Sequence, residues 1–124
     1  MTKILIVDDE PLIAELLQDR LEAEGFEVVT QHNGLDALQT MLTLRPDVVI
    51  SDLMMPSMGG VPMLTAMQEN AYLADTPVIL MSGRPEDDVP QDCRNYKAFL
   101  RKPMKLDDVV ATVQRVTAGE DGQD

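Results

Sequence analysis

The chain alternates between short apolar runs and longer segments in which apolar residues recur at helical spacing. Five runs are short and predominantly apolar, and the clearest of them read as strands buried on both faces of a sheet. These runs lie at 3–7, 26–30, 48–50, 77–82 and 97–101. The run at 26–30 alternates in part with polar residues, which indicates a strand at or near the edge of the sheet.

The segments after the first, second, third and fifth runs predict helices. Pro11 stands where the first turn of a helix tolerates proline, and Gly25 is a suitable stop for the same helix. The second helix must end before Pro46, because the residue before a proline disfavours helical geometry. Apolar stripes that begin at Val61 and Leu106 mark the other two helices.

The segment after the fourth run is the weakest candidate for a helix. Residues 83–93 contain two prolines and four acidic residues. A full helix here would place Pro90 in its interior at a cost of about 3 kcal/mol. We therefore expect a loop with at most one or two helical turns.

This alternation predicts an α/β fold of the flavodoxin-like (βα)5 class. We expect a doubly wound, parallel, five-stranded sheet in the order 2-1-3-4-5, in which the fourth helix is short or irregular. One domain is expected over residues 1–118, followed by a flexible tail over residues 119–124. Such a sheet has its topological switch point between strands 1 and 3, where ligands bind.

The composition narrows the setting and the partners. The single cysteine, Cys93, fits a reducing, cytosolic setting, so we expect a cytoplasmic protein. The net charge of −12 argues against direct binding to nucleic acid or to an anionic membrane, and it suits partners with basic surfaces. No apolar run approaches the roughly 20 residues that span a membrane, so membrane insertion is not expected.

Polar side chains follow four of the five predicted strands. They are Asp8, Asp9, Asp52, Ser82 and Lys102. Carboxylates gathered at one switch point repel one another, and their pKa values rise unless a cation lies among them. Mg2+ suits such a site because it is a hard cation that needs few carboxylates and keeps several waters.

The chemistry that fits these groups is phosphoryl transfer to Asp52. A carboxylate beside Mg2+ can attack phosphorus and form an aspartyl phosphate. Phosphoryl transfer needs positioning and charge neutralisation, part of which the Lys102 ammonium would supply. The Ser82 hydroxyl can donate to a phosphoryl oxygen. The sequence has no Walker-type glycine loop, so binding of ATP in the manner of a kinase is not expected.

Four motifs combine these residues with their neighbours. They are Val7-Asp8-Asp9-Glu10, Asp52-Leu53-Met54-Met55-Pro56 with Met58 and Gly60, Ser82-Gly83, and Lys102-Pro103. In this order and on successive strand ends, the motifs resemble those of the receiver domain of bacterial two-component response regulators, of the kind found in chemotaxis regulators. Each motif alone is weak, whereas the whole set is specific, and the resemblance extends from Lys3 to about Thr117.

The resemblance implies how the phosphoryl group would be handled. Asp52 would accept it from the histidine of a sensor kinase or of a phosphotransfer protein, and Lys102 and Ser82 would contact it. Ser82 would then move inward, and Phe99 would change rotamer. This switch would alter the surface that meets a downstream protein target.

The resemblance also implies a set of Mg2+ ligands. Asp9 would bind the ion directly, with Asp8 nearby or acting through water. Asp52 and the backbone carbonyl of Met54 would complete the ligands that the protein provides.

Two features depart from the family pattern. The segment between Ser82 and Lys102 carries prolines and less helix than is usual, which puts in doubt the usual output face made by helix 4, strand 5 and helix 5. Met54 and Arg84 lie two residues after Asp52 and Ser82, at positions that flank the phosphoryl group in this family. Arg84 could reach that group and slow the attack of water.

Three functions stay open at this point. The favoured one is a phosphorylated signalling module that catalyses only its own phosphorylation and dephosphorylation and is not otherwise an enzyme. The alternative is a Mg2+-dependent hydrolase, although such enzymes need an acid two residues after the nucleophile, where this chain has Met54. A degenerate receiver would act only as a docking module. The chain is either a stand-alone receiver or one excised from a longer protein.

Overall fold

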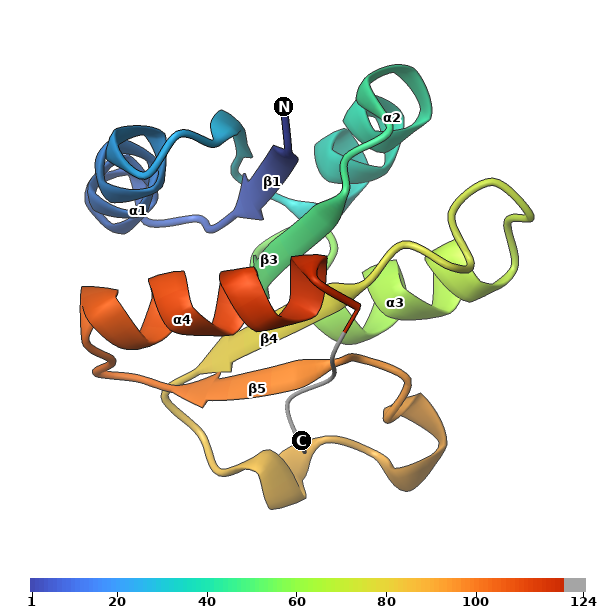
Figure 1. Ribbon diagram of the computed structural model, residues 1–124. Coiled ribbons are helices and arrows are strands. Elements are labelled where there is room, and N and C mark those ends of the chain that lie inside the picture. Colours follow the sequence, from blue (N-terminus) through green and yellow to red (C-terminus); the bar gives the residue numbers. More distant parts are fainter. Residues whose placement is uncertain (120–124) are drawn as a thin grey trace.

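The computed structural model describes residues 1–119, and Figure 1 shows its helices arranged on both sides of one layer of strands. The strands are β1 (Lys3–Val7), β2 (Glu27–Gln31), β3 (Val48–Asp52), β4 (Val78–Ser82) and β5 (Ala98–Arg101). All neighbouring strands are parallel, in the order β2-β1-β3-β4-β5. The predicted fold class and strand order are therefore confirmed.

Four α-helices flank the sheet within residues 1–119. They are α1 (Pro11–Ala23), α2 (Gly34–Leu44), α3 (Gly60–Gln68) and α4 (Leu106–Thr117), so α4 is the helix predicted after the fifth strand. Asn33 caps α2 by accepting a hydrogen bond from the Asp36 N–H. None of these helices combines the length and the apolar character that crossing a membrane would require.

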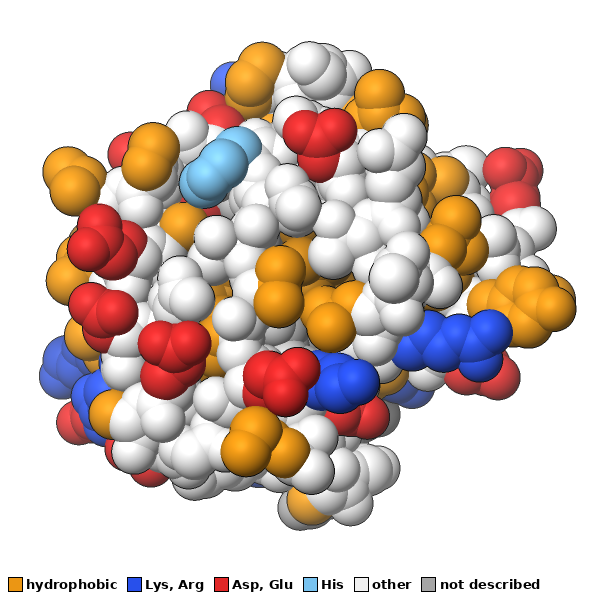
Figure 2. Space-filling model, turned by 90° about the horizontal axis from the view of Figure 1, so that it is seen from above, with side chains coloured by type: hydrophobic (Ala, Val, Ile, Leu, Met, Phe, Trp, Pro, Cys, Tyr) orange, Lys and Arg blue, Asp and Glu red, His pale blue; other side chains and the backbone are white. Residues whose placement is uncertain are grey.

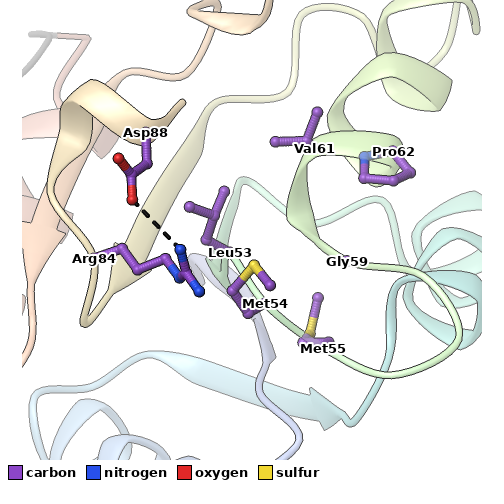
Figure 3. Close-up of a pocket in the computed structure, with 8 residues that line it drawn as sticks. All are labelled: Leu53, Met54, Met55, Gly59, Val61, Pro62, Arg84 and Asp88. Atoms are coloured by element: carbon purple, nitrogen blue, oxygen red, sulfur yellow. Dashed lines mark ion pairs between the residues drawn. The ribbon is translucent and has the colours of Figure 1, made fainter. Parts of the chain in front are cut away.

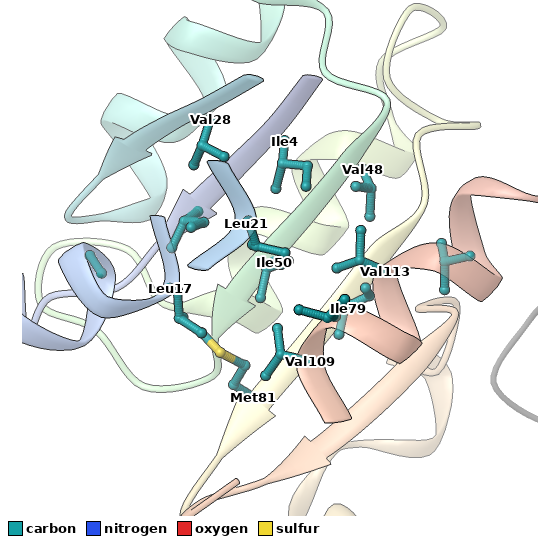
Figure 4. Close-up of a cluster of buried hydrophobic side chains, with 14 residues drawn as sticks. Ile4, Leu17, Leu21, Val28, Val48, Ile50, Ile79, Met81, Val109 and Val113 are labelled. Carbon is teal, nitrogen blue, oxygen red and sulfur yellow. The ribbon is translucent and has the colours of Figure 1, made fainter. Parts of the chain in front are cut away.

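Two hydrophobic clusters cover the two faces of the sheet. One lies under α1 and α4, and in Figure 4 Ile50 and Ile79 of the sheet meet Val113 of α4. The other lies under α2 and α3 and includes Val89 of the β4–β5 connection. Because both faces are covered, β3 and β4 are buried along their whole length.

Two short 3-10 turns stand in place of the helix between β4 and β5. They are η1 (Glu86–Asp88) and η2 (Gln91–Cys93). Each turn directly follows a proline, Pro85 or Pro90, in extended geometry. The expectation of at most one or two helical turns in this segment is confirmed, and the spacing of the prolines explains why no longer helix forms.

Side chains after η2 fasten the connection back onto η1. The Arg94 guanidinium donates hydrogen bonds to the backbone carbonyls of Glu86, at 3.0 Å, and Val89, at 2.9 Å. The Tyr96 hydroxyl donates to the Glu86 carboxylate, and burial together with this bond raises the pKa of Tyr96 to about 12. The ring centroids of Tyr96 and of Phe99 in β5 are 6.2 Å apart, so the two rings pack together and hold the connection against the sheet.

The observed elements begin and end within a few residues of the predicted ones. β2 spans Glu27–Gln31 rather than 26–30, a shift within the usual uncertainty of element ends. The division into a domain at 1–118 and a flexible tail at 119–124 stays a prediction, because that tail lies outside the described residues except for Gly119.

Candidate functional site

Two carboxylates lie next to each other at the centre of the sheet. The register pairs Val7 of β1 with Ser51 of β3, so Asp8 and Asp52 leave their strands side by side. Asp8 is fully buried and Asp52 is 7% exposed. Both therefore stand at the topological switch point, where α/β sheets of this order bind ligands.

Lys102, which follows β5, brings a cation to these carboxylates. Its Nζ donates hydrogen bonds to Asp52 Oδ2 at 2.9 Å and to Asp8 Oδ2 at 3.2 Å. Glu10 Oε1 lies 3.8 Å from the same nitrogen. One ammonium thus partly neutralises three carboxylates, and its own side chain is only 20% exposed.

Burial and charge act in opposite directions on these groups. Burial is the main reason that the pKa of Asp8 is raised, and the hydrogen bond from the Glu10 N–H and the charge of Lys102 do not cancel it. Burial would lower the pKa of Lys102, but the hydrogen bond to Asp52 and the charges of Asp52 and Asp8 outweigh it, so that pKa is raised. Lys102 is therefore positively charged at neutral pH, whereas burial makes the ionised form of Asp8 unfavourable.

Three carboxylates in this centre could hold a metal ion. One oxygen each from Asp8, Glu10 and Asp52 lie within 4.8 Å of one another. Asp9, predicted as a direct ligand, is exposed and is not a member of this group. Glu10 has extended backbone geometry, and successive side chains of an extended chain alternate in direction, which explains why Asp8 and Glu10 converge.

The sequence did not indicate Glu10 as a metal ligand, because the pattern of apolar residues does not reveal that the backbone after β1 stays extended. The metal role of Asp9 stays a prediction. Hard oxygen donors at this spacing, beside a single lysine, suit a divalent cation such as Mg2+.

The loop after Asp52 packs tightly against the end of its strand. Gly60, the first residue of α3, donates its N–H to the Leu53 carbonyl at 2.9 Å. A Cβ on Gly60 would lie 2.8 Å from the backbone oxygen of Asp52, so a larger residue would displace the loop. The Met54 N–H makes a long contact of 3.4 Å with Asp52 Oδ1, which places the Met54 backbone beside the carboxylate.

Ser82 stands on the same edge of the sheet, but within residues 1–119 its hydroxyl makes no hydrogen bond to Asp8, Asp52 or Lys102. It ends β4, whose Met81 is paired with Asp52, and it is 1% exposed. Its hydroxyl oxygen accepts a hydrogen bond from the Arg84 N–H at 2.9 Å. Its carbonyl accepts another from the Lys102 N–H at 2.8 Å, so Ser82 is joined to Lys102 through the backbone.

A pocket of about 580 Å3 opens between the loop after Asp52, the start of α3 and the turn after β4 (Figure 3). Met54 and Arg84, the two residues predicted to flank a phosphoryl group, both line it. Arg84 forms an ion pair of 3.7 Å with Asp88, and both side chains are exposed. Arg84 is thus held toward η1 at the rim of the pocket.

Phe99, the predicted switch residue, is partly buried in β5. It packs against the cluster under α2 and α3, with Tyr96 beside it. Its ring neighbour Tyr96 belongs to the β4–β5 connection, in which short 3-10 turns replace a full helix.

The acidic composition is visible on the molecular surface. On the face shown in Figure 2, acidic side chains occur at many positions, with hydrophobic side chains exposed between them. The acidic side chains of the described residues are therefore not confined to the acidic centre.

The fold and this centre define an α/β protein with a lysine-bridged acidic site at its switch point. The family model of the response regulator receiver domain matches residues 4–114. The chain therefore belongs to the response regulator receiver domain family, and the predicted resemblance is confirmed.

Relatives of known function match this chain over part of their length. Regulatory protein AtoC of Escherichia coli is 36% identical over 93% of this chain and 25% of its own length. The DNA-binding response regulator MtrA of Mycolicibacterium smegmatis is 32% identical over 96% of this chain and 52% of its own length. The chain thus spans about half or less of the length of these curated relatives.

Solved structures agree over nearly the whole chain. The chemotaxis response regulator CheY4 of Vibrio cholerae is 30% identical, with a TM-score of 0.82, and the match covers 94% of this chain and 98% of that one. The response regulator protein TrrA of Thermotoga maritima, in complex with Mg2+ and BeF, is 29% identical with a TM-score of 0.84, covering 94% and 99%.

The expectation that the chain does not bind nucleic acid finds no support in these comparisons. MtrA is described as a DNA-binding protein, and this chain is similar to about half of it. For this chain, the −12 charge remains the only argument against such binding.

Proposed function

We propose that this receiver domain accepts a phosphoryl group on Asp52 and thereby switches a surface that binds a partner. The observation that carries the proposal is the placement of the Lys102 ammonium, 2.9 Å from Asp52 and 3.2 Å from Asp8, at the switch point of the sheet. A carboxylate held beside a fixed cation can act as a nucleophile toward phosphorus without the repulsion that bare carboxylates would impose.

Each group of the centre has a task in the transfer. Among the contacts of residues 1–119, Asp52 Oδ1 makes only the long contact with the Met54 N–H, so it is the oxygen better placed to attack. Lys102, bonded to Oδ2, neutralises charge that builds up on the phosphoryl oxygens. The Ser82 hydroxyl oxygen accepts a hydrogen bond from the Arg84 N–H, and the hydroxyl would donate its proton to a phosphoryl oxygen once the side chain turns toward the centre.

The acidic centre fits Mg2+, which when bound would neutralise further charge on the phosphoryl oxygens. Asp8, Asp52 and the carbonyl of Met54 are the ligands proposed with Asp9. Glu10 is the alternative to Asp9 as a direct ligand, because its carboxylate already lies close to those of Asp8 and Asp52. Calorimetric titration with Mg2+ distinguishes the two: Asp9→Asn should weaken binding about tenfold or more, and Glu10→Gln should weaken it much less. The reverse order would assign the ligand to Glu10.

The switch would run from Ser82 to Phe99. Loss of the bond between the Ser82 hydroxyl and the Arg84 N–H frees the turn after β4, which leads into η1. The Glu86–Tyr96 hydrogen bond and the contact between Tyr96 and Phe99 link η1 to β5. A change at Ser82 would therefore reach the Phe99 side chain through this connection.

A sensor histidine kinase, or a phosphotransfer protein, is the proposed donor, and a downstream protein is the proposed target. The family and the relatives' descriptions as regulators support this pairing. Met54 supports a switch over a hydrolase, because its side chain cannot transfer a proton to a leaving group or water. The domain would then catalyse only its own phosphorylation and dephosphorylation.

Intact-mass measurement after incubation with acetyl phosphate tests the proposal. With Mg2+, the wild-type protein should gain one phosphoryl group, and without Mg2+ it should gain little. Asp52→Asn should gain none, while Asp47→Asn, which changes an exposed aspartate before the same strand, should behave as the wild type. No adduct on the wild type in the presence of Mg2+ would instead favour a domain that only docks.

A further inference from the structure

Met54 differs from nearly all other methionines of the chain in its exposure. The sequence contains nine methionines, all within residues 1–119. Only Met1 and Met54 are exposed, at 89% and 59%. The remaining seven are buried or partly buried, namely Met41, Met55, Met58, Met63, Met67, Met81 and Met104. Apart from the N-terminal residue, Met54 is therefore the methionine that a dissolved molecule reaches most readily.

This exposed thioether lies at the border of the acidic centre. The Met54 N–H is 3.4 Å from Asp52 Oδ1. The residue also lines the pocket of about 580 Å3 between the loop after Asp52 and the turn after β4. Figure 3 shows the Arg84 side chain extending across this pocket toward Met54. The sulfur of Met54 thus shares the pocket with a guanidinium.

The guanidinium of Arg84 is weakly held. Its ion pair with Asp88 spans 3.7 Å between two exposed side chains, and exposed pairs of this kind contribute little to stability. A thioether is a poor hydrogen-bond acceptor, so Met54 does not draw Arg84 away from Asp88. A stronger acceptor on the Met54 side chain would compete with Asp88 for the guanidinium.

We propose that Met54 is an oxidation site, at which a peroxide converts the thioether to the sulfoxide. The sulfur lone pair attacks one peroxide oxygen, so that an S–O bond forms and the O–O bond breaks. The departing hydroxide takes the proton from the transferred oxygen and leaves as water. Sulfur is oxidised and the peroxide is reduced. Because the thioether needs no deprotonation, its exposure decides where the reaction occurs.

The sulfoxide changes the contacts across the pocket. Its oxygen is a polar acceptor to which the Arg84 guanidinium donates in place of Asp88, which joins the loop after Asp52 to the turn after β4. The same turn holds the hydrogen bond from the Arg84 N–H to the Ser82 hydroxyl oxygen. Oxidation therefore restrains the turn and slows phosphorylation of Asp52. This consequence rests on the proposed function, whereas oxidation of Met54 does not.

Peptide mass spectrometry during treatment of the folded, full chain with hydrogen peroxide tests the site. Met54 should react at a rate close to that of Met1 and at least about tenfold faster than Met55 or Met58. In the urea-unfolded chain, the rates of these four methionines should converge. Equal rates of Met54 and its two neighbours in the folded chain would overturn the proposal.

NMR of the Arg84 Nε–H tests the bridge in the unphosphorylated protein. Exchange of this proton with water should slow after oxidation and return to its first rate after treatment with methionine sulfoxide reductases. In Met54→Leu, peroxide should leave the exchange unchanged. That variant keeps Cys93, so it also controls for oxidation of the free thiol. Unchanged exchange in the oxidised wild type would overturn the bridge.

Phosphorylation by acetyl phosphate and Mg2+ tests the consequence. The oxidised wild type should react about threefold more slowly than the reduced wild type, as expected for one added hydrogen bond. Met54→Leu and Arg84→Gln should each react equally fast before and after peroxide. Equal slowing in either variant, or faster reaction of the oxidised wild type, would overturn this consequence. No phosphorylation of either form would contradict the proposed function, and the oxidation rates and Arg84 exchange would then decide the proposal by themselves.

Discussion

Lys102 and Arg94 each join separate parts of the chain through hydrogen bonds, but they do so with different partners. Lys102 bonds the carboxylates of Asp8 and Asp52 in a largely buried centre. Arg94 bonds the backbone carbonyls of Glu86 and Val89 near the surface. Around Lys102, a positive charge partly balances the negative charges of carboxylates. Around Arg94, the guanidinium donates to neutral carbonyl oxygens, which do not neutralise its charge.

This difference separates a site suited to chemistry from one suited to contacts. The centre around Lys102 gathers charges that repel one another unless a cation lies among them, so it responds to anything that changes charge there. In the β4–β5 connection, Arg94 itself donates to neutral backbone carbonyls, and the ion pair of that segment, Arg84–Asp88, is exposed.

Lys102→Met should lower the free energy of unfolding by about 3 kcal/mol, because it leaves the buried Asp8 and Asp52 without their cation. Urea denaturation monitored by circular dichroism measures the loss. Lys105→Met, at an exposed lysine, should change stability by no more than about 0.5 kcal/mol. Equal losses in the two variants would show that the centre around Lys102 has no special electrostatic role.

Asp8→Asn should raise stability at neutral pH, by less than Lys102→Met lowers it. The pKa of Asp8 is higher in the folded protein than in the unfolded chain. Between these two pKa values, folding is therefore accompanied by the uptake of a proton. The wild type therefore loses stability as the pH rises from the ordinary Asp pKa of 3.8 through the raised value. Asp8→Asn lacks this loss, and its advantage should grow over the same range.

Unfolding curves at several pH values measure this advantage. Asp9→Asn is the matched control, because Asp9 is exposed and forms no ion pair within the described part of the chain. An advantage of Asp8→Asn that does not vary with pH would contradict the cause assigned to it.

Arg94→Met should cost about 1.5 kcal/mol, because the carbonyls of Glu86 and Val89 lose charged donors. The effect should be local: hydrogen exchange should accelerate in 86–96 and change little in β4. Arg115→Met is the control, since the one hydrogen bond of Arg115 within residues 1–119 is a 3.4 Å contact with Thr112. Faster exchange throughout the sheet would mean that Arg94 supports the whole fold.

Tyr96→Phe should have the smallest effect, about 0.5 kcal/mol, because it removes one hydrogen bond to the exposed Glu86. Tyr72→Phe removes the same hydroxyl from an exposed ring that makes no hydrogen bond through it within residues 1–119. Thermal unfolding of both variants makes the comparison, and a larger loss in Tyr72→Phe would contradict it.

The sequence predicted the fold well because apolar runs and prolines act locally. Continuous runs such as Val48–Ile50 specify buried strands, and Pro85 and Pro90 limit the helix that can form between β4 and β5. The acidic centre was also predictable in outline, since parallel strands end at one edge. These inferences needed only residue types and their spacing along the chain.

The partners of individual side chains could not be read in the same way. Glu10 joins Asp8 and Asp52 because the backbone after β1 is extended, which the pattern of apolar residues did not reveal. Arg94 finds carbonyls that only the path of the loop brings near.

The most direct test of the account is the position of the phosphoryl group. After reaction with acetyl phosphate and Mg2+, reduction with borohydride converts an aspartyl phosphate into homoserine, which peptide mass spectrometry can locate. The account predicts homoserine at position 52 alone, and its loss in Lys102→Met. Homoserine at position 8 or 9, or a phosphoryl group elsewhere in the chain, would contradict it.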